Sequence, residues 1–293
     1  MKELFLLLNN CPCDYRCVFC SRGLEHHQSQ LKNYFKYFDF KKEALTIQNI
    51  ILNHYHRLNI KCIKIGNNEP LNHPNIINIV GFSRITGYKK ILIQTSGVRF
   101  SNLEFTKKII NAGLTHVDLP IYGANDKIHD KIVRLKGSFN LIMKAINNLK
   151  KFNIEVELHT LILKQNLQDI HAIKRKFHNI VMRFPFPDPG SPLDYRRICV
   201  RLSDIPEEIK KDIKLMIPCI QNNESGDKDL RESEEIKFKP ESPNKIGRYK
   251  SNPDKKVKPL KCTNCKFFKR CDGIYPLYLK IYGDDELNPQ YKI

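Results

Sequence analysis

The run Cys13-Asp14-Tyr15-Arg16-Cys17-Val18-Phe19-Cys20 follows closely on the apolar stretch Leu4 to Leu8. The apolar stretch predicts a strand, and the cysteine run predicts a short loop at the carboxyl end of that strand. Three thiols therefore stand together on one loop, where the first strand of the fold ends.

Three cysteines at this spacing form a metal-binding pattern. Iron-sulfur clusters are held by cysteine thiolates separated by only a few residues. Three such ligands hold three corners of a cubane and leave its fourth iron open. An open coordination position distinguishes a reactive metal centre from a structural one. A structural cluster or a zinc site is the alternative, although zinc sites usually contain paired C-x2-C units.

Hydrophobic periodicity organises the first two thirds of the chain into alternating strands and helices. Apolar residues at helical spacing predict helices over 47–58 and 139–149. Strand-like runs are expected at Leu4 to Leu8, Ile60 to Ile65, Lys90 to Gln94, Thr115 to Ile121, Glu155 to Leu163 and Asn179 to Phe184. Six strands alternating with helices imply parallel βα units, and they are too few for a complete barrel. We expect an α/β fold, an open (β/α)6 barrel over residues 1–190, with its site at the carboxyl ends of the strands.

Length and cysteine usage limit the class of protein. The 293 residues are enough for one large domain and a smaller appendage, here residues 191–293. No secretory signal precedes the cysteine loop, so we expect reduced thiols in a cytoplasmic protein. No apolar run approaches the roughly 20 residues that a membrane-spanning helix needs, and no membrane partner is expected.

The charge of the chain is strongly positive, at +19 with a pI near 9.5. Clustered Lys and Arg side chains neutralise phosphates, which is the usual sign of a nucleic-acid surface. Here the lysines are spread along the whole chain. A solvated basic surface is therefore favoured, and a nucleic-acid partner is the alternative.

Later strand ends carry turn residues of their own. Gly66-Asn67-Asn68-Glu69-Pro70 follows the second strand and Thr95-Ser96-Gly97 follows the third. His129-Asp130 and Arg134 come after the fourth. Each segment alone is an ordinary βα turn, because Gly, Asn, Ser and Pro populate turns for backbone reasons. We expect His129 to cap or pack; His159, near the end of the fifth strand, faces either the site or the core.

The last third has a different character. Pro185 to Pro192 is rich in chain breakers, a helix is expected over 204–217, and residues 221–260 predict a flexible loop. Beyond it lies the spacing Cys262-x2-Cys265-x5-Cys271. Cys219 or Cys199 completes a set of four thiols, whereas Cys62 reads as a small buried residue. Four cysteines suit a structural zinc ion as well as a cluster.

The cysteine triplet, with Phe19 just before its last member, resembles the signature of the radical S-adenosylmethionine (radical SAM) enzymes. Gly66 to Pro70 is similar to their Gly-Gly-Glu-Pro segment, and Thr95-Ser96-Gly97 to their Thr-Asn-Gly turn. The resemblance implies a SAM-binding 4Fe-4S cluster and a site for S-adenosylmethionine. It implies metal ligation by Cys13, Cys17 and Cys20, and cofactor contacts from Phe19, Gly66, Asn68, Glu69, Thr95, Ser96 and Arg134. In such enzymes an Arg at the place of Arg134 pairs with the cofactor carboxylate.

The C-terminal cysteines resemble the auxiliary-cluster half of the SPASM and twitch domains appended to many radical SAM enzymes. Tyr275 stands where a SPASM domain has its next cysteine, so the resemblance implies one auxiliary 4Fe-4S cluster. Its implied ligands are Cys219, Cys262, Cys265 and Cys271, with zinc as the alternative occupant.

The family resemblance implies an enzyme that reductively cleaves S-adenosylmethionine to a 5′-deoxyadenosyl radical and takes hydrogen from a substrate. The appended cluster segment favours a peptide or protein substrate. The basic charge favours RNA or a phosphorylated small molecule as the alternative. A non-catalytic iron-sulfur electron-transfer protein is a third interpretation, which the strand-end motifs oppose. Flavodoxin or ferredoxin is the expected electron donor, and the assignment to oxidoreductases or transferases stays open.

Overall fold

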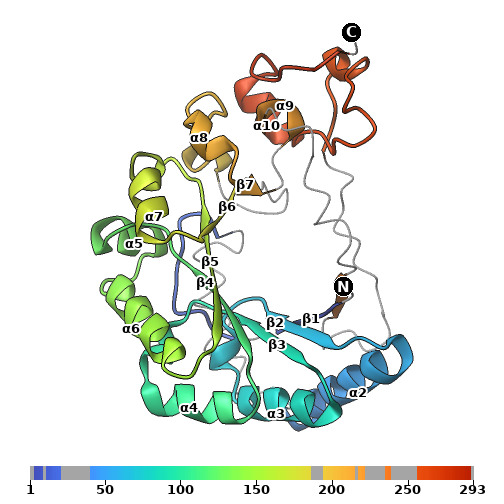
Figure 1. Ribbon diagram of the computed structural model, residues 1–293, viewed down its shortest axis with the longest axis vertical. Coiled ribbons are helices and arrows are strands. Elements are labelled where there is room, and N and C mark those ends of the chain that lie inside the picture. The colour runs from blue at the N-terminus through green and yellow to red at the C-terminus, as the bar shows by residue number, and fades with distance from the viewer. Residues whose placement is uncertain are drawn as a thin grey trace.

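The strands form one curled sheet in which every neighbouring pair is parallel (Figure 1). The computed structural model describes residues 3–8, 11–20, 40–185, 194–214, 217–221, 235–238 and 256–291. The strand order is β7-β6-β5-β4-β3-β2-β1-β8. The strands are β1 (Glu3–Leu7), β2 (Cys62–Gly66), β3 (Lys90–Gln94), β4 (His116–Pro120), β5 (Glu155–Leu161), β6 (Val181–Arg183), β7 (Ile213–Lys214) and β8 (Glu235–Phe238). The sheet is thus the open α/β barrel that the periodicity predicts.

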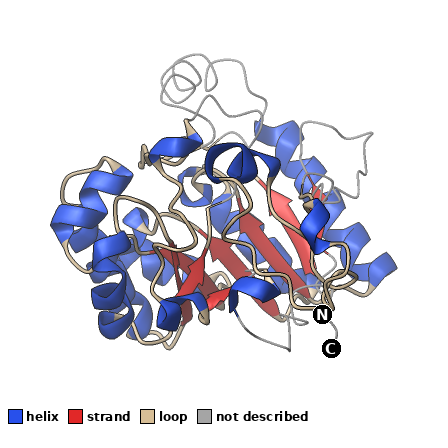
Figure 2. Cartoon of the chain, turned by 90° about the horizontal axis from the view of Figure 1, so that it is seen from above, coloured by secondary structure: helices blue, strands red, loops and turns tan. Residues whose placement is uncertain are grey.

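Helices cover the outer face of the sheet, as both views show (Figures 1 and 2). Alternate strand residues on this face, such as Ile63, Ile93 and Leu119, are apolar and fully buried. The helices are α2 (Phe40–Leu58), α3 (Ile76–Thr86), α4 (Leu103–Asn111), α5 (Asp126–Val133), α6 (Ser138–Lys150), α7 (Ile170–Lys176), α8 (Glu207–Lys210), α9 (Pro218–Gln221) and α10 (Pro276–Tyr282). Those over 40–58 and 138–150 confirm the two helices predicted from spacing.

The concave face carries polar side chains instead. Gln94, Asp118 and His159 lie on the neighbouring strands β3, β4 and β5, and Asp118 and His159 are buried. Polar groups on the face that helices leave open are typical of a ligand-binding surface at the carboxyl ends of parallel strands.

One prediction for the last third is wrong. The helix expected over 204–217 ends at Lys210, and Ile213 instead pairs with Met182 to form β7. The apolar residues Ile209 and Ile213 happen to be spaced like those of a helix, but the sheet edge takes Ile213. Of the loop expected over 221–260, Gln221 ends α9 and residues 235–238 form β8, which pairs with β1. Residues 222–234 and 239–255 lie outside the described residues.

Two tyrosines of α10 join this helix to residues 199–202. The Tyr278 hydroxyl accepts a hydrogen bond from the Leu202 amide (2.9 Å) and donates one to Glu286. The Tyr282 hydroxyl donates to the Cys199 carbonyl oxygen (2.7 Å). Tyr278 is almost fully buried. These contacts fix α10 against residues 199–202.

Candidate functional site

The cysteine loop is fastened to the end of α5 through its backbone. The Arg16 amide donates to the Val133 carbonyl oxygen (2.8 Å), and the Val18 amide donates to that of Ile132 (2.9 Å). The last carbonyls of a helix lack partners within the helix, so they are free to accept these bonds. The fold thereby fixes the loop between Cys13 and Cys20.

Two aromatic side chains anchor the same loop. Tyr15 is buried, and its hydroxyl donates to the Ser96 carbonyl oxygen (3.1 Å). The Phe19 ring meets the Tyr122 ring edge-on, with their centroids 4.9 Å apart. Such a pair contributes about 0.5–1.5 kcal/mol beyond its buried area. Phe19, predicted as a cofactor contact, thus holds Cys20 near the end of β4.

Asn72 is a loop contact that sequence reasoning missed. Its side-chain amide donates to the Pro12 carbonyl oxygen (2.8 Å) and to the Asp14 carboxylate (3.1 Å). These acceptors flank Cys13 on either side. Asn72 follows the Glu69-Pro70 segment by two residues, but no motif marks it.

Burial makes the Cys13 and Cys17 thiols difficult to ionise. It raises the pKa of Cys13 to about 12, and nearby Glu69 adds to the effect. It also raises the pKa of Cys17, as do the neighbouring Cys13 and Cys20, whereas the Arg134 charge lowers it. Metal coordination deprotonates thiols and offsets their repulsion. The donor set fits a metal cluster, and Arg134 acts electrostatically on the same loop.

Glu69 braces the turns after β2 and β3 against each other. Its carboxylate accepts hydrogen bonds from the Leu71 amide (3.1 Å), the Ser96 amide (2.7 Å) and the Thr95 hydroxyl. The side chain is only 1% exposed, and burial raises its pKa although these donors favour the charged form. Glu69, Thr95 and Ser96, all predicted site residues, are therefore brought together.

The turn after β2 is built from two asparagines in the left-handed region. The φ angle is 75° at Asn67 and 49° at Asn68. Asparagine tolerates this region better than most residues, which explains how it replaces a glycine of the motif. At Gly66 the constraint is space, because a Cβ atom would lie 2.7 Å from Cε2 of Phe5.

We expect Asn68→Val to lower the free energy of unfolding by about 1–2 kcal/mol, because a left-handed conformation strains a branched side chain. Asn68→Gly should cost little, since glycine adopts this conformation readily. Anaerobic chemical denaturation of both variants measures the difference. An equal loss in both would assign the effect to contacts of the Asn68 side chain instead.

Ser96 places a hydroxyl beside the cysteine loop. Its Oγ atom is buried and has no hydrogen-bond partner of normal geometry among the described residues, although it lies near enough to Glu69 to favour the charged carboxylate. Gly97 follows at φ 82°, where a Cβ atom would lie 2.7 Å from Cδ2 of Leu119. The Thr95-Ser96-Gly97 turn is therefore packed tightly, and its Ser96 Oγ atom could accept or donate a hydrogen bond to a ligand.

The segment after β4 serves packing and helix capping. His129 is fully buried, as predicted, and its Nδ1 accepts a hydrogen bond from the Tyr122 amide (3.1 Å). Asp130 caps α6 by accepting from the Ser138 hydroxyl (2.7 Å) and the Phe139 amide (2.8 Å). Arg134 is exposed and ends α5 with a φ of 54°.

His129 should make folding stability depend on pH. Burial lowers its pKa to about 4, so between that value and about 6.5 the unfolded chain binds a proton that the folded protein excludes. This contribution is complete above about pH 6.5 and is lost as the pH falls toward 4. Between pH 7 and pH 5 we expect a loss of about 2 kcal/mol.

The matched variant is His129→Gln, which keeps an acceptor for the Tyr122 amide. Urea unfolding at both pH values should show the wild type losing more stability than this variant. Equal losses would contradict the buried, neutral state of His129.

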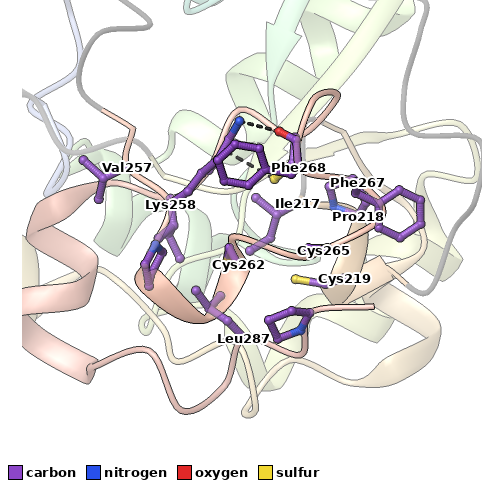
Figure 3. A pocket seen from close by; sticks show the side chains of 15 residues that line it. Ile217, Pro218, Cys219, Val257, Lys258, Cys262, Cys265, Phe267, Phe268 and Leu287 are labelled. Atoms are coloured by element: carbon purple, nitrogen blue, oxygen red, sulfur yellow. Dashed lines mark hydrogen bonds between the residues drawn. The ribbon is translucent and has the colours of Figure 1, made fainter. Parts of the chain in front are cut away.

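A second group of thiols lines one pocket of the C-terminal segment (Figure 3). Cys219 comes from α9, whereas Cys262, Cys265 and Cys271 come from the segment before α10. Apolar side chains complete the lining, among them Ile217, Val257, Phe267, Phe268, Ile274 and Leu287. Cys199 lies outside this lining and is fully buried, with its thiol against the Val200 carbonyl oxygen (3.4 Å). Cys62 is buried in β2, as predicted.

These four thiols influence one another. Burial raises the pKa of Cys219 to about 11, and the charges of Cys271, Cys262 and Cys265 act in the same direction. Within the described ranges, no three His, Cys, Asp or Glu side chains converge closely enough to enclose a single ion. The donor chemistry nevertheless suits a thiolate-bound metal centre.

Known proteins share both the sequence and the fold of this chain. Two relatives from Methanosarcina barkeri are an AdoMet-dependent heme synthase, 24% identical over 162 residues, and an Fe-coproporphyrin III synthase, 25% identical over 162 residues. The matches cover 51% and 55% of this chain but only 46% and 37% of those proteins. The chain thus spans less than half of the length of either relative.

Solved structures match over more of the chain. AnSMEcpe with bound AdoMet and the Cp18Cys peptide superimposes with a TM-score of 0.61, at 15% identity, over 99% of this chain and 93% of that one. Streptococcus suis SuiB gives a TM-score of 0.52, at 13% identity, over 80% and 48%. These similarities show a shared fold.

No described helix combines the length and apolar character needed to cross a bilayer.

The family model described as the radical SAM superfamily matches residues 12–177, more than half of the sequence and all three loop cysteines. The chain belongs to the radical SAM superfamily and is an enzyme.

Proposed function

We propose that the protein reductively cleaves S-adenosylmethionine and uses the resulting 5′-deoxyadenosyl radical to take a hydrogen atom from a substrate. One observation carries this proposal: the loop of Cys13, Cys17 and Cys20 is fastened directly to the turns after β2 and β3 and to the end of α5. When bound, a 4Fe-4S cluster supplies the electron and an open iron for the cofactor.

The chain's own residues would bind and orient the cofactor. The three loop thiolates would hold the cluster. The turns carrying Gly66, Asn68, Thr95 and Ser96 would border the S-adenosylmethionine, with Glu69 bracing both turns and Phe19 closing the loop side. Arg134, the cation near Cys17, would pair with the cofactor carboxylate.

We propose a peptide or protein as the substrate. The support is the solved anSMEcpe complex with a bound peptide, whose fold matches this chain almost end to end, including the C-terminal segment. A second candidate is a tetrapyrrole, because the two Methanosarcina relatives are named for heme and coproporphyrin synthesis. The alternative that the substrate is RNA or a phosphorylated small molecule is supported by the basic charge alone.

For the C-terminal thiols we propose one auxiliary 4Fe-4S cluster on Cys219, Cys262, Cys265 and Cys271. The shared pocket of these four cysteines supports it. Zinc is the competing occupant. In this proposal residues 1–190 form the barrel domain, to whose sheet β7 and β8 add the edge strands, and the rest of residues 191–293 forms a SPASM-like or twitch-like domain. The enzyme would work in the cytoplasm as an oxidoreductase supplied by flavodoxin or ferredoxin.

Fractionated cell extract provides the test of the substrate. Anaerobic, reconstituted protein is incubated with S-adenosylmethionine, reductant and each fraction, and 5′-deoxyadenosine is measured. Stimulation by a protease-sensitive fraction would support a peptide or protein. Stimulation that survives protease but follows a porphyrin-absorbing fraction would support the tetrapyrrole, and nuclease sensitivity would support RNA.

A further inference from the structure

A chain of three polar side chains crosses the concave face of the sheet. Gln94 donates through Nε2 to Oδ2 of Asp118 (3.1 Å), and Nδ1 of His159 contacts Oδ1 of the same carboxylate. Asp118 is 3% exposed and His159 is 9% exposed. Gln94 directly precedes the Thr95-Ser96 turn, so the chain runs from the proposed cofactor site to β5.

The contacts fix which nitrogen of His159 carries the proton. Burial would raise the pKa of Asp118, but the hydrogen bond and charge of His159 lower it overall, and Lys64 and Arg183 add to the lowering. An ionised carboxylate only accepts hydrogen bonds, so Nδ1 of His159 must be the donor in this contact. In the neutral form of an imidazole whose Nδ1 carries the proton, Nε2 is the nitrogen with the lone pair. Among the described residues, Nε2 makes no hydrogen bond.

The stability of the fold does not explain why Asp118 and His159 are buried together. A buried carboxylate and imidazole are costly to desolvate, and apolar residues of similar size usually serve a core as well. The outer face of the same strands is packed with apolar residues such as Val117 and Leu119. Buried titratable pairs with a specific charged partner are candidates for functional sites, and this pair lies on the face of the sheet opposite the apolar face.

We propose that His159 is a catalytic residue whose Nε2 accepts a proton from an O–H, N–H or S–H group of the substrate. Asp118 and Gln94 are positioning residues that hold the imidazole. In this step the X–H bond breaks and leaves its electron pair on X, the Nε2 lone pair forms an Nε2–H bond, and no oxidation state changes. The product pair is an X⁻ group and an imidazolium stabilised by the Asp118 carboxylate.

The inference rests on the proposed function in one respect, that the substrate occupies the concave face. Among the described residues, the other charges that act on the Asp118 carboxylate are those of Lys64 and Arg183, and Arg183 is paired with Glu157 (3.7 Å). Ammonium and guanidinium groups donate hydrogen bonds and accept none, and the Glu157 side chain is about half exposed. His159 is therefore the buried base of this surface.

Diethyl pyrocarbonate tests the site without a substrate, because it acylates unprotonated imidazole nitrogens. In the anaerobic reconstituted protein at pH 7 we expect His159 to react within about tenfold of the rate of His171, whose side chain is 42% exposed. His129, fully buried, should stay unmodified. Asp118→Asn should slow the reaction of His159 about fivefold, because the tautomer is no longer fixed. Peptide mass mapping gives each rate, and an unmodified His159 beside a fully modified His171 would overturn the proposal.

The second measurement uses the most stimulating extract fraction. 5′-Deoxyadenosine release is measured with the fraction (stimulated) and without it (basal). We expect His159→Gln to lower the ratio of stimulated to basal release by about 100-fold, and Asp118→Asn to lower it by about tenfold. The matched control is His116→Gln, two residues from Asp118 on the same face and also paired with a carboxylate, that of Glu155 (3.0 Å). It should leave the ratio unchanged.

A purely structural role would lower stimulated and basal release together and keep their ratio, and that result would overturn the proposal. So would a His159→Gln ratio within twofold of the wild type. If His159→Gln does not fold, Asp118→Asn supplies the same comparison. A wild type that never cleaves S-adenosylmethionine would defeat the proposed function instead, and the diethyl pyrocarbonate result would still decide the state of His159.

Discussion

Replacing Cys13, Cys17 and Cys20 together with alanine is expected to abolish formation of 5′-deoxyadenosine from S-adenosylmethionine. The three thiols are the metal donors of the loop that is fastened to the β2 and β3 turns, and no other thiol of that site replaces three lost ligands. The C-terminal thiols draw on separate segments, so the iron-sulfur absorption assigned to them should persist. Anaerobic incubation followed by chromatography measures the product.

Cys62→Ala is the matched control for this experiment. Cys62 is a buried thiol of β2 that lies against Glu3, away from the loop. Its removal should leave the product yield unchanged. Persistent cleavage in the triple variant would eliminate the radical mechanism as we propose it.

The second large effect concerns metal content. Anaerobically reconstituted wild-type protein should contain about eight irons per chain, because a triplet and a quartet of thiols would each hold a four-iron cluster. Removing Cys219, Cys262, Cys265 and Cys271 should lower the iron to about four per chain. Elemental analysis with parallel visible absorption gives both numbers.

Cys199 is the matched control for Cys219 in the measurement of iron content. It is fully buried outside the thiol pocket, so Cys199→Ser should keep about eight irons, whereas Cys219→Ala should lose part of the C-terminal iron. About four irons together with one zinc in the wild type would defeat the auxiliary-cluster proposal and leave the loop cluster intact.

The strands that form the barrel were predictable because each is a run of alternating or apolar residues of ordinary length. Predicted and observed bounds of β1 to β6 agree within a few residues. The edge strands were not predictable from periodicity. β7 has only two residues, and β8 is a four-residue Glu-Ile-Lys-Phe segment within a long charged stretch. Pairing with β6 and β1, rather than local pattern, makes these segments strands.

The residues of the candidate site also fall into some that the sequence predicts and some that it does not. The loop cysteines are close in sequence, so their spacing alone predicts a metal centre. Asn72 is 58 residues from Asp14, and His159 is 41 residues from Asp118. Only the packing of neighbouring strands brings such partners together. The position of His159 near a strand end was visible in the sequence, but nothing there identified Asp118 as its partner.

The most direct measurement is the stoichiometry of S-adenosylmethionine cleavage by the reconstituted wild-type protein under anaerobic reduction. We predict that methionine and 5′-deoxyadenosine form in equal amounts and only when the loop cysteines are present. Protein with its full iron content that binds S-adenosylmethionine yet releases no 5′-deoxyadenosine, with or without extract, would contradict the account.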